Sequence, residues 1–441
     1  MRTRLGDDSS RRTRNAPMLG ALLISVQLAL AGPVASQPPA ASAAPAVQSV
    51  TLPDPTGSYA IGRKTRALVD RSRPEVMTAD PSDHREVLLH IWYPAERTGG
   101  GTPAAYVDID PQNPVFQNDY RRYGPERLLS VRTHAMENAR ISRAQHRYPV
   151  VLFSHGLADV SSYYSTFIEN LASHGYVVVG VESPYYSATL RFPDGRVARY
   201  QSQRPPDRID ATADERQRLL LIRQAEAIVQ ARDLVFVLDE LERLNRTDPD
   251  FRTRLDLQHV GVFGHSRGGF AGPHACYLDR RFKACLNLDG YRHTEAVMQN
   301  GIRQPYMFIQ EQYPWEPPAT PEQMAQAHQT PQQDHQGTVA ASREWDATFR
   351  RMRSTTYIVT VEGAQHMSFS DLPYVVPEQF QTIGIDAGEA LTATSSYINA
   401  FFDHYLKGAR APLLRSRSPF PEVTLEVMEP GATATTVFHP R

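Results

Sequence analysis

Short apolar runs, separated by longer segments of mixed character, make up most of this chain. Seven runs are almost continuously apolar, are rich in β-branched residues and end at a polar residue, a glycine or a proline: 87–93, 150–153, 176–181, 260–263, 284–288, 306–309 and 356–361. Strands of a parallel sheet have this pattern because helices cover both of their faces. The runs therefore predict a mostly parallel sheet.

Three further segments carry apolar residues at helical spacing, namely 161–174, 213–245 and 392–407. Strands that alternate with helices indicate a doubly wound α/β sheet with helices on both faces. Ligands of such sheets bind at the carboxyl ends of the strands. Residues that directly follow a strand are therefore the first candidates for chemistry.

Composition restricts the choice of partners. The chain has 441 residues, 41% of them hydrophobic and 22% charged, which suits a globular domain with a sizeable core. The formal net charge of −1 provides no overall field toward nucleic acid or acidic lipid. We therefore expect no nucleic-acid partner.

The first 36 residues have the pattern of a signal peptide. Arginines between positions 2 and 14 precede an apolar stretch at 18–32, and small residues follow at Val34-Ala35-Ser36. This pattern predicts a secreted or periplasmic protein, and because the positive charge of the chain is almost all arginine, we interpret the chain as bacterial. The alternative is an uncleaved membrane anchor.

The rest of the chain divides into a linker and one domain. Residues 37–56 are rich in Pro, Ala, Ser and Gln and predict a linker. Residues 57–430 predict a single α/β domain. Within it, the Pro- and Gln-rich segment 312–345 is a possible cap insert.

A serine between glycines ends one of the predicted strands. Gly264-His265-Ser266-Arg267-Gly268 follows the run 260–263 directly. A tight strand-to-helix turn of this composition exposes the serine hydroxyl as a nucleophile. The alternative is a glycine-rich turn without chemistry, so the context decides between the two.

An acid and a histidine complete the pattern. Asp289 ends the run 284–288, and His366 lies just after the run 356–361. The order Ser, Asp, His is that of the triad of α/β-hydrolases, in which the histidine takes the serine proton and the acid orients the imidazole. Glu311, after the run 306–309, is the alternative acid.

Acyl transfer also needs donors for the oxyanion that develops on the substrate. The backbone N–H of Arg267, the residue after the nucleophile, is one candidate. The second is expected after an early strand, where Leu157 lies in the segment Ser154-His155-Gly156-Leu157. These groups need neither a metal nor a cofactor.

Other features are open at this level. Cys276 and Cys285 are predicted on a helix and the next strand, where they form either a disulfide or two buried thiols. Pro273 is expected to kink the helix after Ser266. Four tyrosines are interpreted either as lining the cleft or as packing at its rim: Tyr163, Tyr164, Tyr185 and Tyr186.

The sequence resembles the plasma-type platelet-activating-factor acetylhydrolases and their bacterial relatives, which have the α/β-hydrolase fold. The matching stretches are IWYPA at 91–95, FSHGL at 153–157, LASHGYVVVGVE at 171–182, GHSRGG at 264–269, LDG at 288–290 and EGAQHMSFSD at 362–371.

The resemblance implies that Ser266 is the nucleophile, His366 the base and Asp289, rather than Glu311, the acid. It also implies that Leu157 and Arg267 provide the oxyanion amides and that short or oxidised acyl chains are released from the sn-2 position of phospholipids. In this sequence Arg267 replaces the apolar residue that is usual in the family.

Our leading hypothesis is a serine carboxylic-ester hydrolase for a small-molecule or lipid ester. One alternative is a polyesterase similar to cutinases. An alternative from another class is a catalytically inactive binding module on the same fold. Contact with a membrane surface stays open, since no amphipathic membrane helix stands out in the sequence.

Overall fold

A computed structural model describes residues 48–97, 101–201, 213–291, 293–312, 343–432 and 435–439. The chain separates into the units Met1–Ala46 and Val47–Arg441, and every described residue belongs to the second. The predicted signal peptide and nearly all of the predicted cap insert lie outside the described residues. None of the described helices combines the length and the apolar character that a membrane crossing requires.

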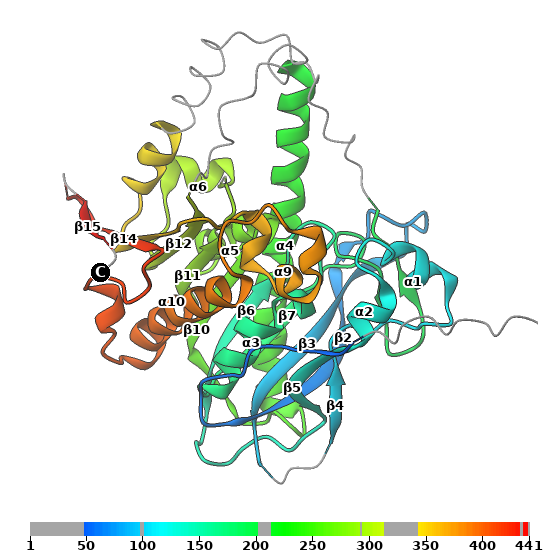
Figure 1. Cartoon of the computed structure of the whole chain (residues 1–441). Helices are drawn as coiled ribbons and strands as arrows, with labels where there is room; N and C mark the ends of the chain where they lie inside the picture. The colour runs from blue at the N-terminus through cyan, green and yellow to red at the C-terminus, as the bar shows by residue number, and fades with distance from the viewer. Residues whose placement is uncertain are drawn as a thin grey trace, which may run out of the picture. The chain divides into compact units, whose positions relative to one another are not determined.

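Among the described residues, one sheet contains 13 strands in the order β1-β5-β2-β3-β7-β6-β10-β11-β12-β13-β14-β15, with β4 beside β5 (Figure 1). Its strands are β1 (Val50–Thr51), β2 (Ala60–Pro74), β3 (His84–Ala95), β4 (Thr102–Ala105), β5 (Val131–Glu137), β6 (Tyr148–Ser154), β7 (Val177–Glu182), β10 (Leu255–His265), β11 (Phe282–Leu288), β12 (Tyr306–Glu311), β13 (Thr356–Val361), β14 (Val423–Met428) and β15 (Thr436–Phe438). A separate pair consists of β8 (Leu190–Arg191) and β9 (Val197–Ala198).

The centre of the sheet is parallel, as predicted. The six neighbours β7, β6, β10, β11, β12 and β13 all pair in parallel, and each contains one of the predicted runs. The remaining run, 87–93, lies in β3, which is antiparallel to both of its neighbours. A strand inside a covered sheet is apolar on both faces whichever way it runs, so the pattern could not give its direction.

Strand β2 was not predicted from the sequence because it contains charged residues. This strand carries several basic side chains, among them Arg63 and Lys64, which form ion pairs with Glu137 and Asp250. Both basic residues are buried. Because the acidic partners lie far away in the sequence, no local pattern indicated that these basic residues are buried in a strand.

Both predicted domain boundaries need correction. The predicted linker reaches residue 56, but Val50–Thr51 pair with β5 and Leu52 is buried. At the other end, β15 at Thr436–Phe438 extends the sheet beyond residue 430. Short strands of this kind depend on a neighbouring strand for their hydrogen bonds, so local composition did not reveal them.

The helices form a layer on each face of the sheet. Their bounds are α1 (Pro114–Asp119), α2 (Pro125–Leu129), η1 (Ser161–Tyr164), α3 (Ser165–Ser173), α4 (Ala213–Thr247), α5 (Arg267–Leu278), α6 (Glu295–Asn300), η2 (His366–Phe369), α9 (Leu372–Val375), η3 (Pro377–Gln379), α10 (Ala387–Lys407) and η4 (Pro412–Leu414). Residues 343–349 are also helical. Each predicted helical segment coincides with helix: 161–174 includes η1 and α3, 213–245 lies within α4, and 392–407 lies within α10.

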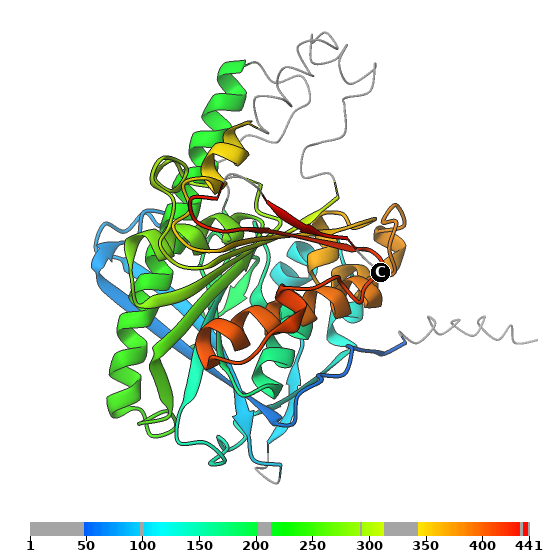
Figure 2. The ribbon, with the colours of Figure 1, turned by 90° about the vertical axis from the view of Figure 1, so that its left-hand side faces the viewer.

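Two apolar clusters bury the faces of the sheet. Side chains of α3 and α10, such as Phe167 and Phe402, belong to one cluster. Side chains of α4 and α5, such as Leu238 and Ala275, belong to the other. Figure 2 shows α10 on one side of the strands and α4 on the other. The sheet therefore has helices on both faces, as predicted.

The turn from β10 into α5 is closely packed. A Cβ on Gly268 would lie 2.0 Å from the carbonyl oxygen of Ser154, and one on Gly264 would lie 2.4 Å from the carbonyl oxygen of Gly268. Both glycines thus allow backbone to approach backbone. This contact presses the first turn of α5 against the end of β6.

The two cysteines are free thiols, and both are buried. Cys276 lies on α5 and Cys285 on β11, as predicted, but they form no disulfide. Pro273 lies inside α5. Nothing in the structure explains its presence there.

We predict that Gly268→Ala destabilises the fold by roughly 4 kcal/mol or more, because its Cβ meets rigid backbone. The matched control is Gly272→Ala in the same helix, where the nearest atom to a Cβ lies at 3.8 Å. That change is expected to be neutral or to stabilise by up to about 1 kcal/mol, because Ala favours helix over Gly. Thermal unfolding of both variants measures the difference, and equal midpoints would contradict the packing argument.

Candidate active site

Ser266 lies at the turn between β10 and α5 in an unusual backbone conformation. Its φ and ψ angles are 53° and −117°, which non-glycine residues rarely adopt. Strain of this kind occurs where the surrounding structure holds a residue in place for function. The turn is a nucleophile elbow in its geometry, and the context thus resolves the ambiguity of the Gly-x-Ser-x-Gly motif.

The structure brings the three predicted triad residues together. His366 Nε2 lies 2.9 Å from Ser266 Oγ, and His366 Nδ1 lies 2.6 Å from Asp289 Oδ2. Asp289 follows β11 and His366 begins η2 after β13. Strand ends at a common edge of the sheet thus bring together side chains that are far apart in sequence.

The hydrogen bonds fix the tautomer of His366. A carboxylate only accepts, so Nδ1–H donates to Asp289, and Nε2 is left to accept from the Ser266 hydroxyl. Burial lowers the pKa of His366, but the hydrogen bond and charge of Asp289 outweigh burial, so that its pKa is raised. This is the arrangement in which an imidazole can take the proton of a serine.

Asp289, not Glu311, contacts the imidazole ring. The second oxygen of Asp289, Oδ1, accepts from the backbone N–H of Glu311 at 3.1 Å, and Oδ2 also lies 2.9 Å from the Tyr291 hydroxyl. The Glu311 carboxylate contacts the same hydroxyl. Glu311, the alternative acid, therefore contacts Tyr291, while Asp289 contacts the imidazole of His366.

The hydrogen bonds around Tyr291 need more protons than Tyr291 has. Its one hydroxyl proton lies between two carboxyl groups, those of Asp289 and Glu311. Burial and the charge of Asp289 raise the pKa of Glu311 to about 7. Glu311 is therefore the carboxyl group that holds a second proton near neutral pH. The Tyr291 ring also stacks on His366, with centroids 5.3 Å apart.

A second tyrosine supports the other side of His366. The His265 ring lies 4.6 Å from that of His366, and its Nε2 lies 2.9 Å from the His366 carbonyl oxygen. His265 Nδ1 is 2.8 Å from the Tyr164 hydroxyl, which is 2.7 Å from Asp159 Oδ2. These groups fix the backbone that carries the His366 imidazole.

This row of hydrogen bonds also requires an added proton. Three bonds need three protons, while a neutral imidazole and a phenol supply two. Burial, together with the charge of His366, lowers the pKa of His265 well below its usual range. Burial raises the pKa of Asp159 to about 6. Below about pH 6, where Asp159 is protonated, an added proton therefore belongs on Asp159 rather than on His265.

The ring of His155 orients the loop that contains Leu157. His155 Nδ1 lies 2.7 Å from the Gly156 carbonyl oxygen, and its Nε2 accepts from the Ser183 N–H at 3.3 Å. Burial lowers the pKa of His155 to about 4, so this neutral tautomer is maintained. Because a peptide unit is planar and trans, fixing the Gly156 carbonyl also fixes the direction of the Leu157 N–H.

Arg267 is the first residue of α5. Its N–H is one of the helix N-terminal amides, which favour negative charge because they have no partner within the helix. The backbone of Arg267 directly follows the nucleophile. The two amides predicted from the sequence thus belong to segments that adjoin Ser266, one after β6 and one after β10.

Comparison with known proteins gives the same family. The chain matches the family "platelet-activating factor acetylhydrolase, isoform II" over residues 45–407. The chain belongs to this family. It is 25% identical to the platelet-activating factor acetylhydrolase of Gallus gallus, over 66% of this chain and 70% of the relative. It is 23% identical to a probable 1-alkyl-2-acetylglycerophosphocholine esterase of Arthroderma benhamiae, over 85% and 93%.

A solved structure supports the same conclusion. The ferulic acid esterase of Streptomyces cinnamoneus superposes with a TM-score of 0.66 and 28% sequence identity, over 86% of this chain and 99% of that one. The platelet-activating factor acetylhydrolase family and this neighbour identify the chain as an α/β-hydrolase that cleaves carboxylic esters.

The clustered tyrosines of this acetylhydrolase-family member mostly pack. Tyr163, Tyr164 and Tyr186 are buried, and Tyr185 is only partly exposed. Tyr163 contacts Tyr123 edge-on at 5.8 Å. Of the two readings of these tyrosines, the structure thus favours packing around the site.

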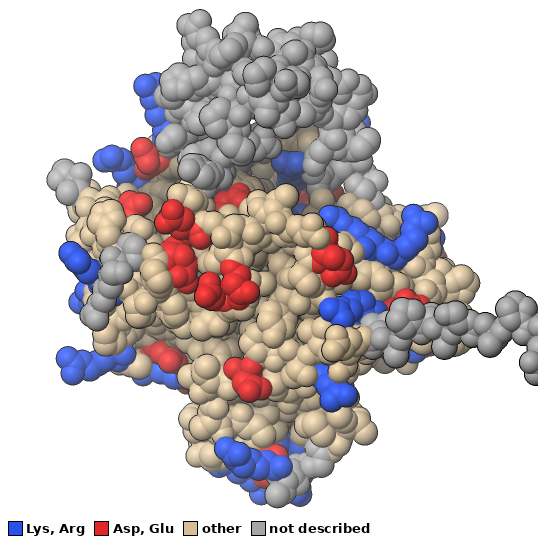
Figure 3. Space-filling view, viewed as in Figure 1, with Lys and Arg blue, Asp and Glu red and all other residues tan. Residues whose placement is uncertain are grey.

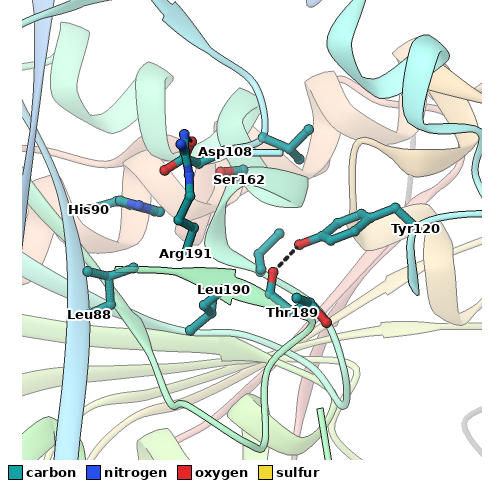
Figure 4. Close-up of a pocket in the computed structure, with 10 residues that line it drawn as sticks. Leu88, His90, Asp108, Tyr120, Ser162, Thr189, Leu190 and Arg191 are labelled. Carbon is teal, nitrogen blue, oxygen red and sulfur yellow. Dashed lines mark hydrogen bonds and ion pairs between the residues drawn. The ribbon is translucent and has the colours of Figure 1, made fainter. Parts of the chain in front are cut away.

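Figure 4 shows a small pocket next to the loop that follows Leu157. Polar side chains in its wall include His90, Ser162 and the ion pair of Arg191 with Asp108. The Tyr120 hydroxyl donates to the Thr189 carbonyl beside it. No triad residue lines this pocket, so it is separate from the nucleophile.

One group of side chains among the described residues could geometrically hold a metal ion. It consists of His265, Asp289 and His366, whose possible ligand atoms lie within 4.8 Å of one another. The ring nitrogens of both histidines already face hydrogen-bond partners. A metal would therefore have to displace the triad bonds.

Sequence reasoning did not assign a supporting role to four residues around the triad, although it named Tyr164 among the tyrosines near the cleft. Asp159, Tyr164, His265 and Tyr291 are all close to predicted site residues in sequence, and this nearness is the one signal that could have suggested them. Their roles depend on hydrogen bonds across different strands and loops. Such bonds have no local pattern.

We predict that Asp289→Asn lowers kcat for a short-chain ester by roughly 10³- to 10⁴-fold. The amide would favour the wrong His366 tautomer while it leaves the volume unchanged. Ester hydrolysis and thermal unfolding should be measured together. A matched loss in Glu311→Gln would instead assign the acid role to Glu311.

We predict that Glu311→Gln moves the acidic limb of the kcat/KM profile to lower pH. Above about 7 Glu311 is ionised, and its negative charge favours the protonated imidazole, so His366 becomes an effective base only at higher pH. Glutamine removes that charge. A pH profile over roughly pH 5 to 9, which brackets the titration of histidine, measures the shift. An unchanged limb would show that Glu311 does not influence His366.

Proposed function

We propose that this protein hydrolyses short acyl esters, with the sn-2 acetyl group of a glycerophospholipid as the preferred type of substrate. The observation that carries the proposal is the hydrogen-bonded row Ser266–His366–Asp289 at an elbow. The substrate class comes from relatives that are named for platelet-activating factor or for 1-alkyl-2-acetylglycerophosphocholine.

In the proposed acylation step, Ser266 Oγ attacks the ester carbonyl while His366 Nε2 takes its proton. Asp289 stabilises the imidazolium that forms. The Leu157 and Arg267 N–H groups donate to the oxyanion, and each such donor is worth roughly 3–4 kcal/mol. The imidazolium then protonates the leaving alcohol, and an acyl-enzyme remains.

In the deacylation step, water replaces the alcohol. His366 takes a proton from the water, whose oxygen attacks the acyl carbonyl, and the same two amides stabilise the second oxyanion. Collapse returns the proton to Ser266 and releases the carboxylic acid. Only side chains and amides of this chain take part.

A second candidate follows from the structural neighbour. The Streptomyces cinnamoneus protein is named a ferulic acid esterase, and it is as similar in sequence as the acetylhydrolases are. An aromatic ester is therefore an alternative substrate, as is the polyester expected for a cutinase-like enzyme. Figure 3 shows charged side chains of both signs interspersed with wide uncharged areas, which provides no strong charge preference on that face.

We also propose that the chain is exported, on the basis of the signal-like pattern in residues 1–36. Sequencing the N-terminus of the secreted or periplasmic protein tests this. A mature chain that begins near residue 37 supports export with cleavage. A full-length chain in the membrane fraction would favour the uncleaved anchor.

We predict that a 1-alkyl-2-acetyl-glycerophosphocholine has a higher kcat/KM than p-nitrophenyl acetate once their intrinsic reactivities are considered. Binding energy from the remote lipid would then lower the reaction barrier. Ser266→Ala is the control and should lose roughly 10⁴-fold or more of kcat on both substrates.

Other outcomes separate the alternatives. If methyl ferulate or a polyester film is preferred, the phospholipid assignment is wrong while the triad stands. If an active-site fluorophosphonate fails to label Ser266, the inactive binding module is favoured. Full activity of Ser266→Ala would remove the nucleophile from the mechanism.

A further inference from the structure

The side chain of Arg267 points into the protein rather than into the solvent. It is 4% exposed and contacts residues from two segments, the helix α4 and the loop after β7. Its three guanidinium nitrogens donate to Gln230 Oε1 at 2.9 Å, to Glu226 Oε2 at 3.1 Å and to the Tyr186 carbonyl oxygen. A charged residue this deeply buried requires such partners, but their identity is informative because two of them also hold the Leu157 loop.

The first link passes through Gln230 of α4. The oxygen of its amide accepts from Arg267 Nε, and the nitrogen donates to the His155 carbonyl oxygen at 3.2 Å. Gln230 is itself 1% exposed. One buried amide therefore joins Arg267 to the residue two positions before Leu157.

The second link passes through the Tyr186 carbonyl oxygen. It accepts from Arg267 and also from the backbone N–H of Ala158 at 3.2 Å. Ala158 has a positive φ of 55°, which marks a tight bend in the loop. This link joins Arg267 to the residue directly after Leu157.

We propose that the Arg267 side chain is a positioning residue that sets the distance between the two oxyanion donors. This inference rests on the proposed function, in which the Leu157 and Arg267 amides donate to the oxyanion. The same residue supplies one donor from its backbone and, through its side chain, holds both flanks of the segment that supplies the other. Movement of the Leu157 loop relative to α5 would break at least one of the two links.

The chemistry of arginine suits this role. The guanidinium is planar, always charged and has five N–H donors in a fixed fork, so it can contact three acceptors in different directions. Lysine has one nitrogen on a flexible stem and cannot span the same three. The Tyr186 ring also lies under the guanidinium, 5.6 Å from its carbon to the ring centroid.

The test compares Arg267→Met and Arg267→Lys with the native protein in ester hydrolysis. We expect kcat to fall by roughly 10- to 100-fold in Arg267→Met, because small misplacements of catalytic groups have effects of this size. KM should change by less than threefold, an expectation that follows from weakening a contact made mainly in the transition state. Binding of a trifluoromethyl ketone, which forms an oxyanion on Ser266, should weaken by the same factor as kcat.

The matched control is Arg63→Met. Arg63 is also a buried arginine, paired with Glu137 and with the Ala105 carbonyl, but it contacts no part of the Leu157 loop. Loss of a buried ion pair should lower its unfolding midpoint as in Arg267→Met, while kcat stays within threefold. Folded protein is quantified in every sample by circular dichroism.

A double-mutant cycle with Gln230→Met tests the first link. If Gln230 acts through Arg267, the loss of kcat in the double variant is smaller than the product of the single losses. Multiplicative losses would contradict the link. If Arg267→Met does not fold, Arg267→Lys and Gln230→Met decide the matter with the same kcat and inhibitor readouts.

The outcomes separate the inference from the proposed function. If the native protein hydrolyses no ester, or if Ser266→Ala keeps the activity, the proposed function fails. If the native activity depends on Ser266 but all Arg267 and Gln230 variants keep kcat and inhibitor affinity, only the positioning role is wrong. Equal kcat losses in Arg63→Met and Arg267→Met would show that the loss comes from general destabilisation. That result would also overturn the positioning role.

Discussion

The site depends on the contact between the first turn of α5 and the end of β6. Gly268 has no room for a Cβ because the Ser154 carbonyl lies against it. This contact lies two residues after the strained Ser266 and holds α5 next to the loop that leaves β6. Ser266, the Arg267 amide and the start of the Leu157 loop therefore meet at one backbone-to-backbone approach. The side chains then refine distances that this approach has already made short.

The sequence alone predicted those parts of the structure that follow a local pattern of apolar residues. Continuous apolar runs located the six central parallel strands, and Ser266, Asp289 and His366 follow three of them. Parallel strands have their carboxyl ends at one edge, so a pattern read along the chain could place distant residues at one site. Strand β2 was not predicted because the acids that pair with its basic residues Arg63 and Lys64 lie on other elements.

The choice between Asp289 and Glu311 shows the limit of prediction from local sequence pattern. Asp289 follows β11, Glu311 is the last residue of the neighbouring β12, and both lie near the site. The bend at Asp289, with a φ of 51°, turns its carboxylate to the imidazole, while Glu311 contacts Tyr291 instead. The two acids thus differ in backbone conformation, and Asp289 is the one that meets the histidine. Composition and periodicity contain no information about such an angle, and the preference for Asp289 over Glu311 rested on its place after a strand and on the resemblance to a family.

Proton counting connects the buried side chains around His366 into one system. On each side of the imidazole a tyrosine hydroxyl lies between a carboxyl group and another acceptor, with Asp159 and Tyr164 on one side and Glu311 and Tyr291 on the other. Each tyrosine has a single proton, so it donates to one neighbour at a time unless the neighbouring acid also holds a proton. Burial raises the pKa of Asp159 to about 6 and that of Glu311 to about 7. Above these pH values both acids carry negative charge near His366, and this charge adds to that of Asp289 in raising the pKa of the imidazole.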